Sequence, residues 1–192
     1  MFNPGESGDS TAYDGTVDGA TYQSGAGLTD INAGANSGSF DFDGSNDEIE
    51  VSSGLNQFAG TDEFTLMLWV NRDQTSFQEL LNTATDGNPG WRFLIERPGN
   101  LRFDNSVDEN FFSGSVVGTS IKHIAVTYNA GAVSLFQNGT VDASGNVGQF
   151  TQSTRKVLIG YYPTQIGYFA GVMDDIRFYN RALSDTEISD IY

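Results

Sequence analysis

The sequence predicts an all-β protein, folded as a two-sheet antiparallel β-sandwich of the jelly-roll type with one short helical turn near the C-terminal end. Short apolar runs alternate with polar residues, which is the period of a half-buried strand. The 23 Gly residues separate these runs, and the 14 Phe and 8 Tyr favour strands. A length of 192 residues suits one large core.

Residues 1–12 are polar and contain Gly, Ser and Pro, so we expect a loose arm followed by a single domain over residues 13–192. The arm lacks the positive and apolar regions of an export signal. No apolar run approaches the roughly 20 residues that span a bilayer. We therefore expect no membrane segment.

The first half of the domain predicts a hairpin and a central strand. Phe40 and Phe42 alternate with aspartates into a turn at 44–46, and residues 49–51 continue the hairpin. Residues 64–70 are apolar on both strand faces. This pattern predicts a strand in the middle of a sheet.

Further strands follow at short intervals. Residues 91–96 and 101–104 form two strands joined by a Pro-Gly-Asn turn. Turn signals at 129–131 and at Asn138-Gly139 predict two more hairpins. Together these segments predict 12 to 14 strands.

The last strand contains an acidic residue at an unexpected place. In the run from residue 172 to 179, strict alternation puts Asp174 on one face with Val172, Ile176 and Phe178. A carboxylate among apolar side chains is costly unless it is hydrogen-bonded, paired or bound to a metal. Beyond this strand, residues 184–187 match a capping box, which predicts a helix start.

The charge is strongly negative: 25 acids against 9 Lys and Arg give a net charge of −16. This field repels nucleic acid and anionic membranes and attracts divalent cations. The sequence contains no Cys, so packing, alone or together with a bound metal, must hold the fold without disulfides.

Five blocks, in order, resemble laminin-G-like domains of the concanavalin A-like lectin/glucanase superfamily. The blocks are SFDFDGSNDEIEV (39–51), FTLMLWVN (64–71), KHIAVTYNAGAVSLFQNGT (122–140), VLIGYYPTQIGYFAG (157–171) and GVMDDIRFYNRALS (171–184). The resemblance implies a concanavalin A-like sandwich. It does not by itself define a function.

The resemblance also implies a structural calcium ion. Relatives hold calcium at the sheet edge, and this carries over to Asp174, with Gly44 and Asp43 contributing. Calcium takes six to eight oxygen ligands from carboxylates, carbonyls and water. The alternative is that Asp174 accepts backbone N–H groups and joins the two ends of the chain.

Aromatic residues next to loops are the candidate ligand-binding residues, because sugar rings stack on flat aromatic faces. The candidates are Trp91, Phe112, Tyr161, Tyr162 and Tyr168. For each one, burial in the core is the competing interpretation.

The sequence does not predict an enzyme. Hydrolases of this fold carry paired carboxylates in an E-x-D-x-x-E spacing, which this chain lacks. Glu48 and Glu50 share a strand face that is expected to be solvated. No nucleophile elbow surrounds a serine, and the single His123 is expected to be structural.

The first functional hypothesis is a non-catalytic adhesion or glycan-binding module that recognises a glycan or a cell-surface polysaccharide. The segments DGTVDGATYQSG (14–25) and GSFDFDGSND (38–47) resemble laminin-G-like domains of tailed-phage structural proteins. This resemblance implies a virion-surface or extracellular location without a signal peptide. The second is a structural capsid-decorating subunit that contacts other virion subunits without binding sugar. A glycoside hydrolase is the third.

Overall fold

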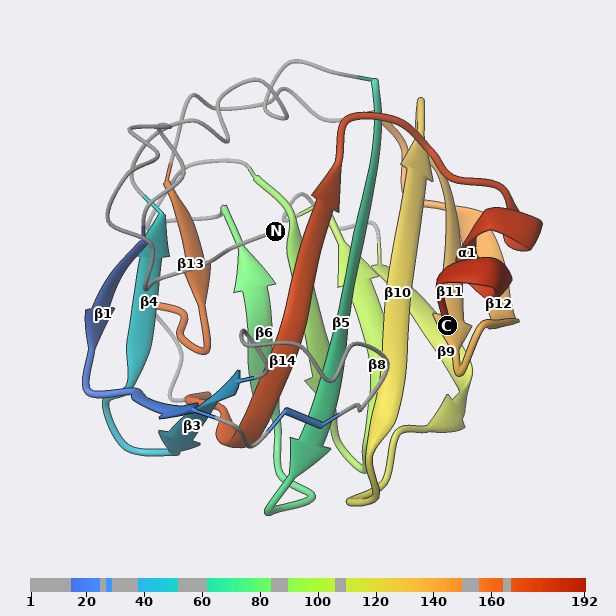
Figure 1. Cartoon of the computed structure of the whole chain (residues 1–192). Helices are drawn as coiled ribbons and strands as arrows, with labels where there is room; N and C mark the ends of the chain where they lie inside the picture. Colours follow the sequence, from blue (N-terminus) through green and yellow to red (C-terminus); the bar gives the residue numbers. More distant parts are fainter. Residues whose placement is uncertain are drawn as a thin grey trace, which may run out of the picture.

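The structure, a computed structural model, describes residues 15–24, 27–28, 38–51, 62–83, 90–105, 110–149, 156–163 and 167–192. Within these ranges the chain forms 14 strands and one α-helix. The strand pairs in these ranges are all antiparallel, and the strands form two seven-stranded sheets. The prediction of an all-β sandwich with one short helix is confirmed (Figure 1).

The first sheet, here called the β6 sheet after its middle strand, has the order β1-β4-β13-β6-β7-β8-β9. Its strands are β1 (Gly15–Asp18), β4 (Glu48–Val51), β13 (Val157–Ile159), β6 (Gln78–Asn82), β7 (Arg92–Glu96), β8 (Asn100–Asp104) and β9 (Asn110–Val116). The β7–β8 hairpin was predicted from the turn at 98–100, and it is present.

The second sheet, the β5 sheet, has the order β12-β11-β10-β5-β14-β3-β2. Its strands are β12 (Thr140–Asn146), β11 (Ala132–Gln137), β10 (Lys122–Asn129), β5 (Glu63–Arg72), β14 (Ala170–Tyr179), β3 (Gly38–Asp43) and β2 (Thr21–Ser24). β5 is central, as its two apolar faces predicted. Asn138 (φ 49°) and Gly139 (φ 72°) form the predicted second turn, between β11 and β12, because both adopt the left-handed conformation that such turns need.

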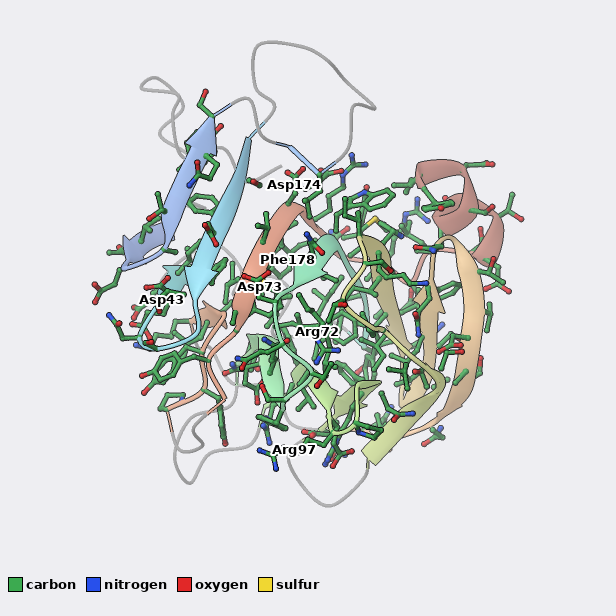
Figure 2. All side chains as sticks on the ribbon, turned by 90° about the horizontal axis from the view of Figure 1, so that it is seen from below. Asp43, Arg72, Asp73, Arg97, Asp174 and Phe178 are labelled. Carbon is green, nitrogen blue, oxygen red and sulfur yellow. The ribbon has the colours of Figure 1, made fainter. Side chains whose placement is uncertain are left out.

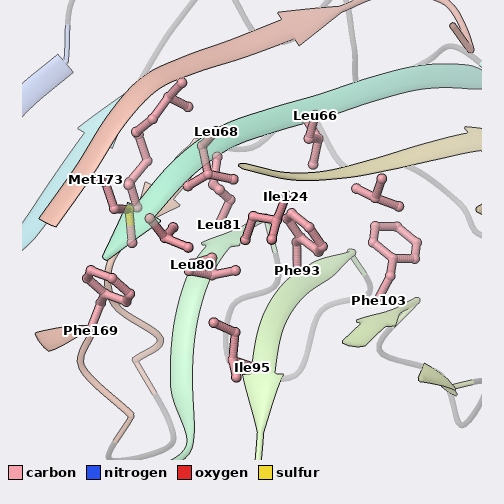
Figure 3. Packing of buried hydrophobic residues seen from close by; sticks show 14 of the residues in the cluster. Leu66, Leu68, Leu80, Leu81, Phe93, Ile95, Phe103, Ile124, Phe169 and Met173 are labelled. Carbon is pink, nitrogen blue, oxygen red and sulfur yellow. The ribbon is translucent and has the colours of Figure 1, made fainter. Parts of the chain in front are cut away.

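The core lies between the two sheets. Figure 3 shows leucines of β5 facing Leu80 and Leu81 of β6, with aromatic rings from β7 and β8 beside them. Leu68, Leu80, Leu81, Phe93 and Phe103 are all completely buried. Burying a side chain of this size contributes roughly 1.5–3 kcal/mol, so this layer is the main stabilising feature of the sandwich.

The predicted hairpin at residues 40–51 is wrong. β3 pairs with β2 and β14 in one sheet, and β4 pairs with β1 and β13 in the other, so the chain crosses between the sheets. Gly44 (φ 79°) makes the bend, and Asp47 Oδ2 accepts the N–H of Asp43 at 2.7 Å. A connection that crosses from one sheet to the other, here called an arch, has the same apolar alternation as a hairpin. The sequence pattern therefore did not distinguish the two.

The predicted face of β14 is also wrong. A bulge sets Asp175 and Ile176 against the single residue Leu68, and Asp175 has φ 48°. Alternation is therefore interrupted, and Asp174 lies opposite Trp69 on the outer face, whereas Ile176 belongs to the core. The aspartate does not share a face with Ile176 or Phe178.

Helix α1 (Asp185–Ile191) covers part of the outer face of the β5 sheet. The Ser184 side chain accepts from Glu187 N–H, and the Glu187 side chain accepts from the Ser184 N–H, which is the predicted capping box. Ile188 then packs with Leu183 against apolar side chains of β5, β10 and β11. In Figure 1, α1 lies close to β11 and β12.

A buried arginine joins the two sheets at one end of the core. Arg72 ends β5 inside the sandwich, as Figure 2 shows, and is 2% exposed. Its Nε donates to Gln78 Oε1 at 2.7 Å, and Gln78 Nε2 donates to the carbonyl of Ala170 at 3.1 Å. Burial lowers the pKa of Arg72. These contacts give Arg72 a structural role.

Candidate functional site

A ten-residue loop between β13 and β14 carries three of the predicted ligand residues. We call residues 160–169 the tyrosine loop; the structure describes residues 160–163 and 167–169 of it. The Phe169 N–H donates to the Gly160 carbonyl at 2.8 Å. This bond brings the two ends of the loop together, which is typical of compact and often functional surface loops.

The loop is attached to the middle strand of the β6 sheet. Gly160 N–H donates to the Leu80 carbonyl, and Glu79 N–H donates to the Gly167 carbonyl, each at 2.8 Å. Gly160 has φ 83°, and a Cβ there would lie 2.6 Å from the ring of Phe42. Only glycine satisfies both conditions without strain.

The aromatic side chains of the loop pack in an ordered way. The rings of Tyr161 and Tyr168 stack with centroids 4.7 Å apart and planes 13° apart. The guanidinium carbon of Arg92 lies 4.2 Å from the centroid of the Tyr162 ring. All three tyrosines are half-buried. The loop therefore offers aromatic surface at a fixed place.

A buried ion pair lies beneath the loop. Arg92 Nε donates to Glu79 Oε1 at 2.8 Å, and Arg92 Nη2 donates to the same oxygen. Glu79 is completely buried. Burial raises the pKa of Glu79 to about 8, although the adjacent Arg92 acts in the opposite direction.

A bulge places two polar groups of β6 on the outer face of the sheet. Glu79 is opposite Leu94, and Asn82 is opposite Arg92, so both lie on the same face. In a regular strand two residues that are three positions apart would lie on opposite faces, and the bulge removes this difference. Asn82 Nδ2 donates to the Tyr161 carbonyl at 2.6 Å. In the described part of the chain, Glu79 Oε2 and Asn82 Oδ1 have no hydrogen-bond partner. Both oxygens are buried hydrogen-bond acceptors.

The structure brings Tyr161, Tyr162 and Tyr168 together but separates the other two predicted ligand residues from them. Trp91 is 4% exposed and packs on Phe64 and Phe103 in the core, which corrects the prediction for this residue. Phe112 belongs to β9, and its side chain lies outside the described residues.

The predicted metal residues do not lie together. Asp43 pairs with Ala170 at one end of β14, four residues before Asp174, which is about 13 Å along a strand. Figure 2 shows Asp43 and Asp174 well apart. Calcium–oxygen distances are about 2.4 Å. Gly44 follows Asp43, so these three residues do not fit a single calcium site.

Asp174 has two backbone partners. Its Oδ2 accepts from Leu28 N–H and its Oδ1 from Asp175 N–H, each at 2.7 Å. Burial raises the pKa of Asp174, and these two hydrogen bonds act against the rise. The hydrogen bond to Leu28 spans 146 residues. It agrees with the alternative to a calcium site, in which Asp174 accepts backbone N–H groups and joins the two ends of the chain. Among the residues the structure describes, no three His, Asp or Glu are grouped to hold a metal.

His123 is the buried histidine of the β5 sheet. It is 2% exposed, its ring lies 5.3 Å from Trp69 and 5.8 Å from Tyr192, and Nδ1 has no hydrogen-bond partner among the described residues. Burial lowers its pKa to about 4; Asp175 opposes this effect and Arg177 adds to it. The imidazole is therefore neutral at pH 7, which fits the expected structural role.

Glu79, Asn82 and Arg92 were missed as site residues by the sequence analysis. Residues 91–96 show the signal for one of them, because Arg92 alternates with apolar Trp91 and Phe93 and so points away from the core. The positions of Glu79 and Asn82 depend on the bulge in β6, which alternation does not reveal.

Solved structures with the same fold include several binding domains. Domain 4 of AbnA, an extracellular arabinanase from Geobacillus stearothermophilus solved with arabinotriose, has a TM-score of 0.70 at 18% identity, covering 93% of this chain and 87% of that one. The binding domain of Paraclostridial Mosquitocidal Protein 1 also scores 0.70 at 18% identity, covering 93% of this chain and 47% of that one. The Ruminococcus gnavus sialidase CBM40 bound to sialyllactose scores 0.57 at 18%, covering 69% and 84%.

By sequence, no curated protein matches the chain. No helix in the described ranges is long and apolar enough to cross a bilayer. A laminin-G-like family model, described as the concanavalin A-like lectin/glucanases superfamily, matches residues 43–189, which is well over half of the chain. The chain therefore belongs to the concanavalin A-like lectin/glucanases superfamily.

Proposed function

We propose that the chain is a non-catalytic glycan-binding module and that the tyrosine loop contacts the glycan. The observation that carries this proposal is the stacked pair of Tyr161 and Tyr168 next to Tyr162, which lies under Arg92. Half-buried aromatic rings at a loop, with polar groups beside them, suit the flat apolar faces and the hydroxyl groups of a sugar.

The comparisons support the class of function. Domain 4 of AbnA was solved with arabinotriose and CBM40 with sialyllactose, and the toxin domains are binding domains. At 18% identity or less these likenesses concern the fold, so the ligand has to be found by experiment.

The test is a glycan array followed by calorimetric titration of the oligosaccharides that bind, with arabinotriose and sialyllactose included. Tyr162→Ala and Tyr168→Ala should weaken binding by about 5- to 150-fold, taking the stacking of a ligand face on an aromatic ring as about 1–3 kcal/mol. Tyr22→Ala is the matched control, since Tyr22 is 43% exposed on β2 in the other sheet. A blank array, or equal losses in all three variants, would refute the proposal.

We further propose adhesion at a virion or other extracellular surface as the setting. The net charge of −16 argues against nucleic acid and anionic membranes as partners. Purified virions or culture fluid, fractionated and probed by mass spectrometry, would show whether the chain is located there.

A purely structural subunit that contacts other virion subunits is the second candidate. It is favoured by the edge strand β1, in which three of four residues are exposed, including Val17 at 38%. Native mass spectrometry would detect its oligomers, and Val17→Lys should dissociate them. A monomer at all concentrations together with glycan binding would favour the first candidate.

A further inference from the structure

On the basis of the proposed function, we infer that Asn82 and Arg92 are positioning residues of the tyrosine loop. Each contacts the loop from a neighbouring strand of the β6 sheet, and the two residues are directly opposite each other in the β6–β7 register. Their role is to fix the aromatic rings before a ligand arrives.

Asn82 fixes the backbone of the loop at its first tyrosine. Its Nδ2 donates to the Tyr161 carbonyl at 2.6 Å, and the residue is completely buried. Tyr161 stacks on Tyr168, and Tyr162 follows directly. One hydrogen bond therefore restrains the peptide between the stacked pair and the ring under Arg92.

Arg92 fixes the ring of Tyr162. The Arg92 guanidinium donates two hydrogen bonds to Glu79, so the guanidinium plane is held in one orientation. On this fixed plane the Tyr162 ring packs at 4.2 Å. A planar guanidinium stacks on an aromatic face, whereas the ammonium group of lysine is a compact point charge.

The other end of the loop is held through the same arginine. The Phe77 ring lies 5.7 Å from the Arg92 guanidinium carbon, and a Cβ on Gly167 would lie 2.4 Å from Phe77. Gly167 therefore packs closely on Phe77. Arg92 thus contacts Tyr162 near the start of the loop and, through Phe77, the backbone near its end.

Positioned rings reduce the entropy lost on binding, because the side chains are already ordered. Neither Asn82 nor Arg92 needs to contact the glycan to have this effect. The inference predicts that changes at these two positions weaken binding even when the chemistry of the tyrosines is intact.

The binding test uses Asn82→Asp and Arg92→Lys. The first keeps the size of the side chain but removes the amide donor, and the second keeps the charge beside Glu79 but removes the planar group. Each should weaken binding of the panel oligosaccharides about tenfold, equivalent to about 1.4 kcal/mol. Arg102→Lys is the matched control, because Arg102 pairs with Glu96 and Asp104 on β7 and β8.

The second test needs no ligand. In protein with ¹³C-labelled tyrosine, the stacked rings of Tyr161 and Tyr168 should give NMR signals shifted by ring currents in the wild type. These shifts should collapse in Asn82→Asp while the melting curve shows a folded protein. If that variant does not fold, Asn82→Ala removes the donor without adding a charge.

The outcomes separate the inference from the proposed function. Wild-type tyrosine shifts and wild-type affinity in both variants would overturn the inference and leave glycan binding intact. Collapsed shifts in a protein that binds no glycan would overturn the proposed function and support the positioning role.

Discussion

Acidification should destabilise the protein through its single histidine. His123 is buried in the folded state against Trp69 and Tyr192, and its pKa is about 4. In the unfolded chain an exposed imidazole has a pKa near 6.5. Between these two values the unfolded state binds a proton that the folded state does not, so the free energy of unfolding falls as the pH falls.

The size of the effect follows from the difference between the two pKa values. Each pH unit below 6.5 costs about 1.4 kcal/mol until the folded imidazole also protonates. At pH 5 the loss attributable to His123 is therefore about 2 kcal/mol relative to pH 7. For a domain of this length, that corresponds to a fall in Tm of about 4–8 °C.

Carboxylates also contribute to acid sensitivity, so the assay compares wild type with His123→Gln. Denaturant melts at pH 7, 6 and 5 should show the stability difference between the two proteins shrinking by about 2 kcal/mol as the pH falls. Because the chain has one His, the imidazole signal in an NMR titration reports its pKa directly. Parallel stability curves, or titration between pH 6 and 7, would refute the reasoning.

Further predictions concern Asp174, the predicted calcium, Trp91 and catalysis. Asp174→Ala leaves the Leu28 N–H without its acceptor and should cost about 2 kcal/mol in denaturant melts; an unchanged midpoint would contradict this. The calcium ion stays a prediction. If it binds at Asp174 with ligands other than Asp43 and Gly44, the Tm of the wild type should be higher in excess calcium than in EDTA, and the Tm of Asp174→Asn should be the same in both. Equal Tm values for the wild type in calcium and in EDTA would refute the prediction. Trp91→Ala should cost about 3–5 kcal/mol as a core truncation, and a variant that stays fully stable but loses glycan binding would return Trp91 to the ligand set. The protein should release no reducing sugar from β-glucans, and activity that Glu48→Gln or Glu50→Gln abolishes would overturn the proposal of a non-catalytic module.

Local sequence signals predicted the features that depend on neighbouring residues. The turn at Asn138-Gly139 needs two left-handed residues, and the cap at Ser184 needs a glutamate three positions later, so each is visible in a short window. The double-sided burial of β5 likewise follows from its own residues.

Features that depend on distant partners were not predictable in this way. The arch after Asp43 and a hairpin have the same alternation, and only pairing with β14 and β13 separates them. The bulge at Asp175 inserts one residue into β14, so the residues before it point to the opposite face from the one that strict alternation predicts. For this reason the prediction put Asp174 on the wrong face.

The sequence predicted the tyrosines of the candidate site but not the residues that support them, for the same reason. Aromatic residues next to a proline at 163 indicated the tyrosine loop, but its buried support comes from β6 and β7, about 80 residues earlier in the chain. Glu79 and Asn82 share a face only because of the bulge in β6.

The hydrogen bond between Phe169 and Gly160 makes the tyrosine loop a place for grafting. Its ends already meet at 2.8 Å and are held by β6, so the sandwich does not depend on how long the intervening chain is. Doubling the length of a flexible loop costs only about 0.6 kcal/mol in closure entropy. A foreign recognition peptide inserted between residues 163 and 167 would therefore leave the sandwich folded, and the domain could serve as a scaffold whose specificity is exchanged one loop at a time.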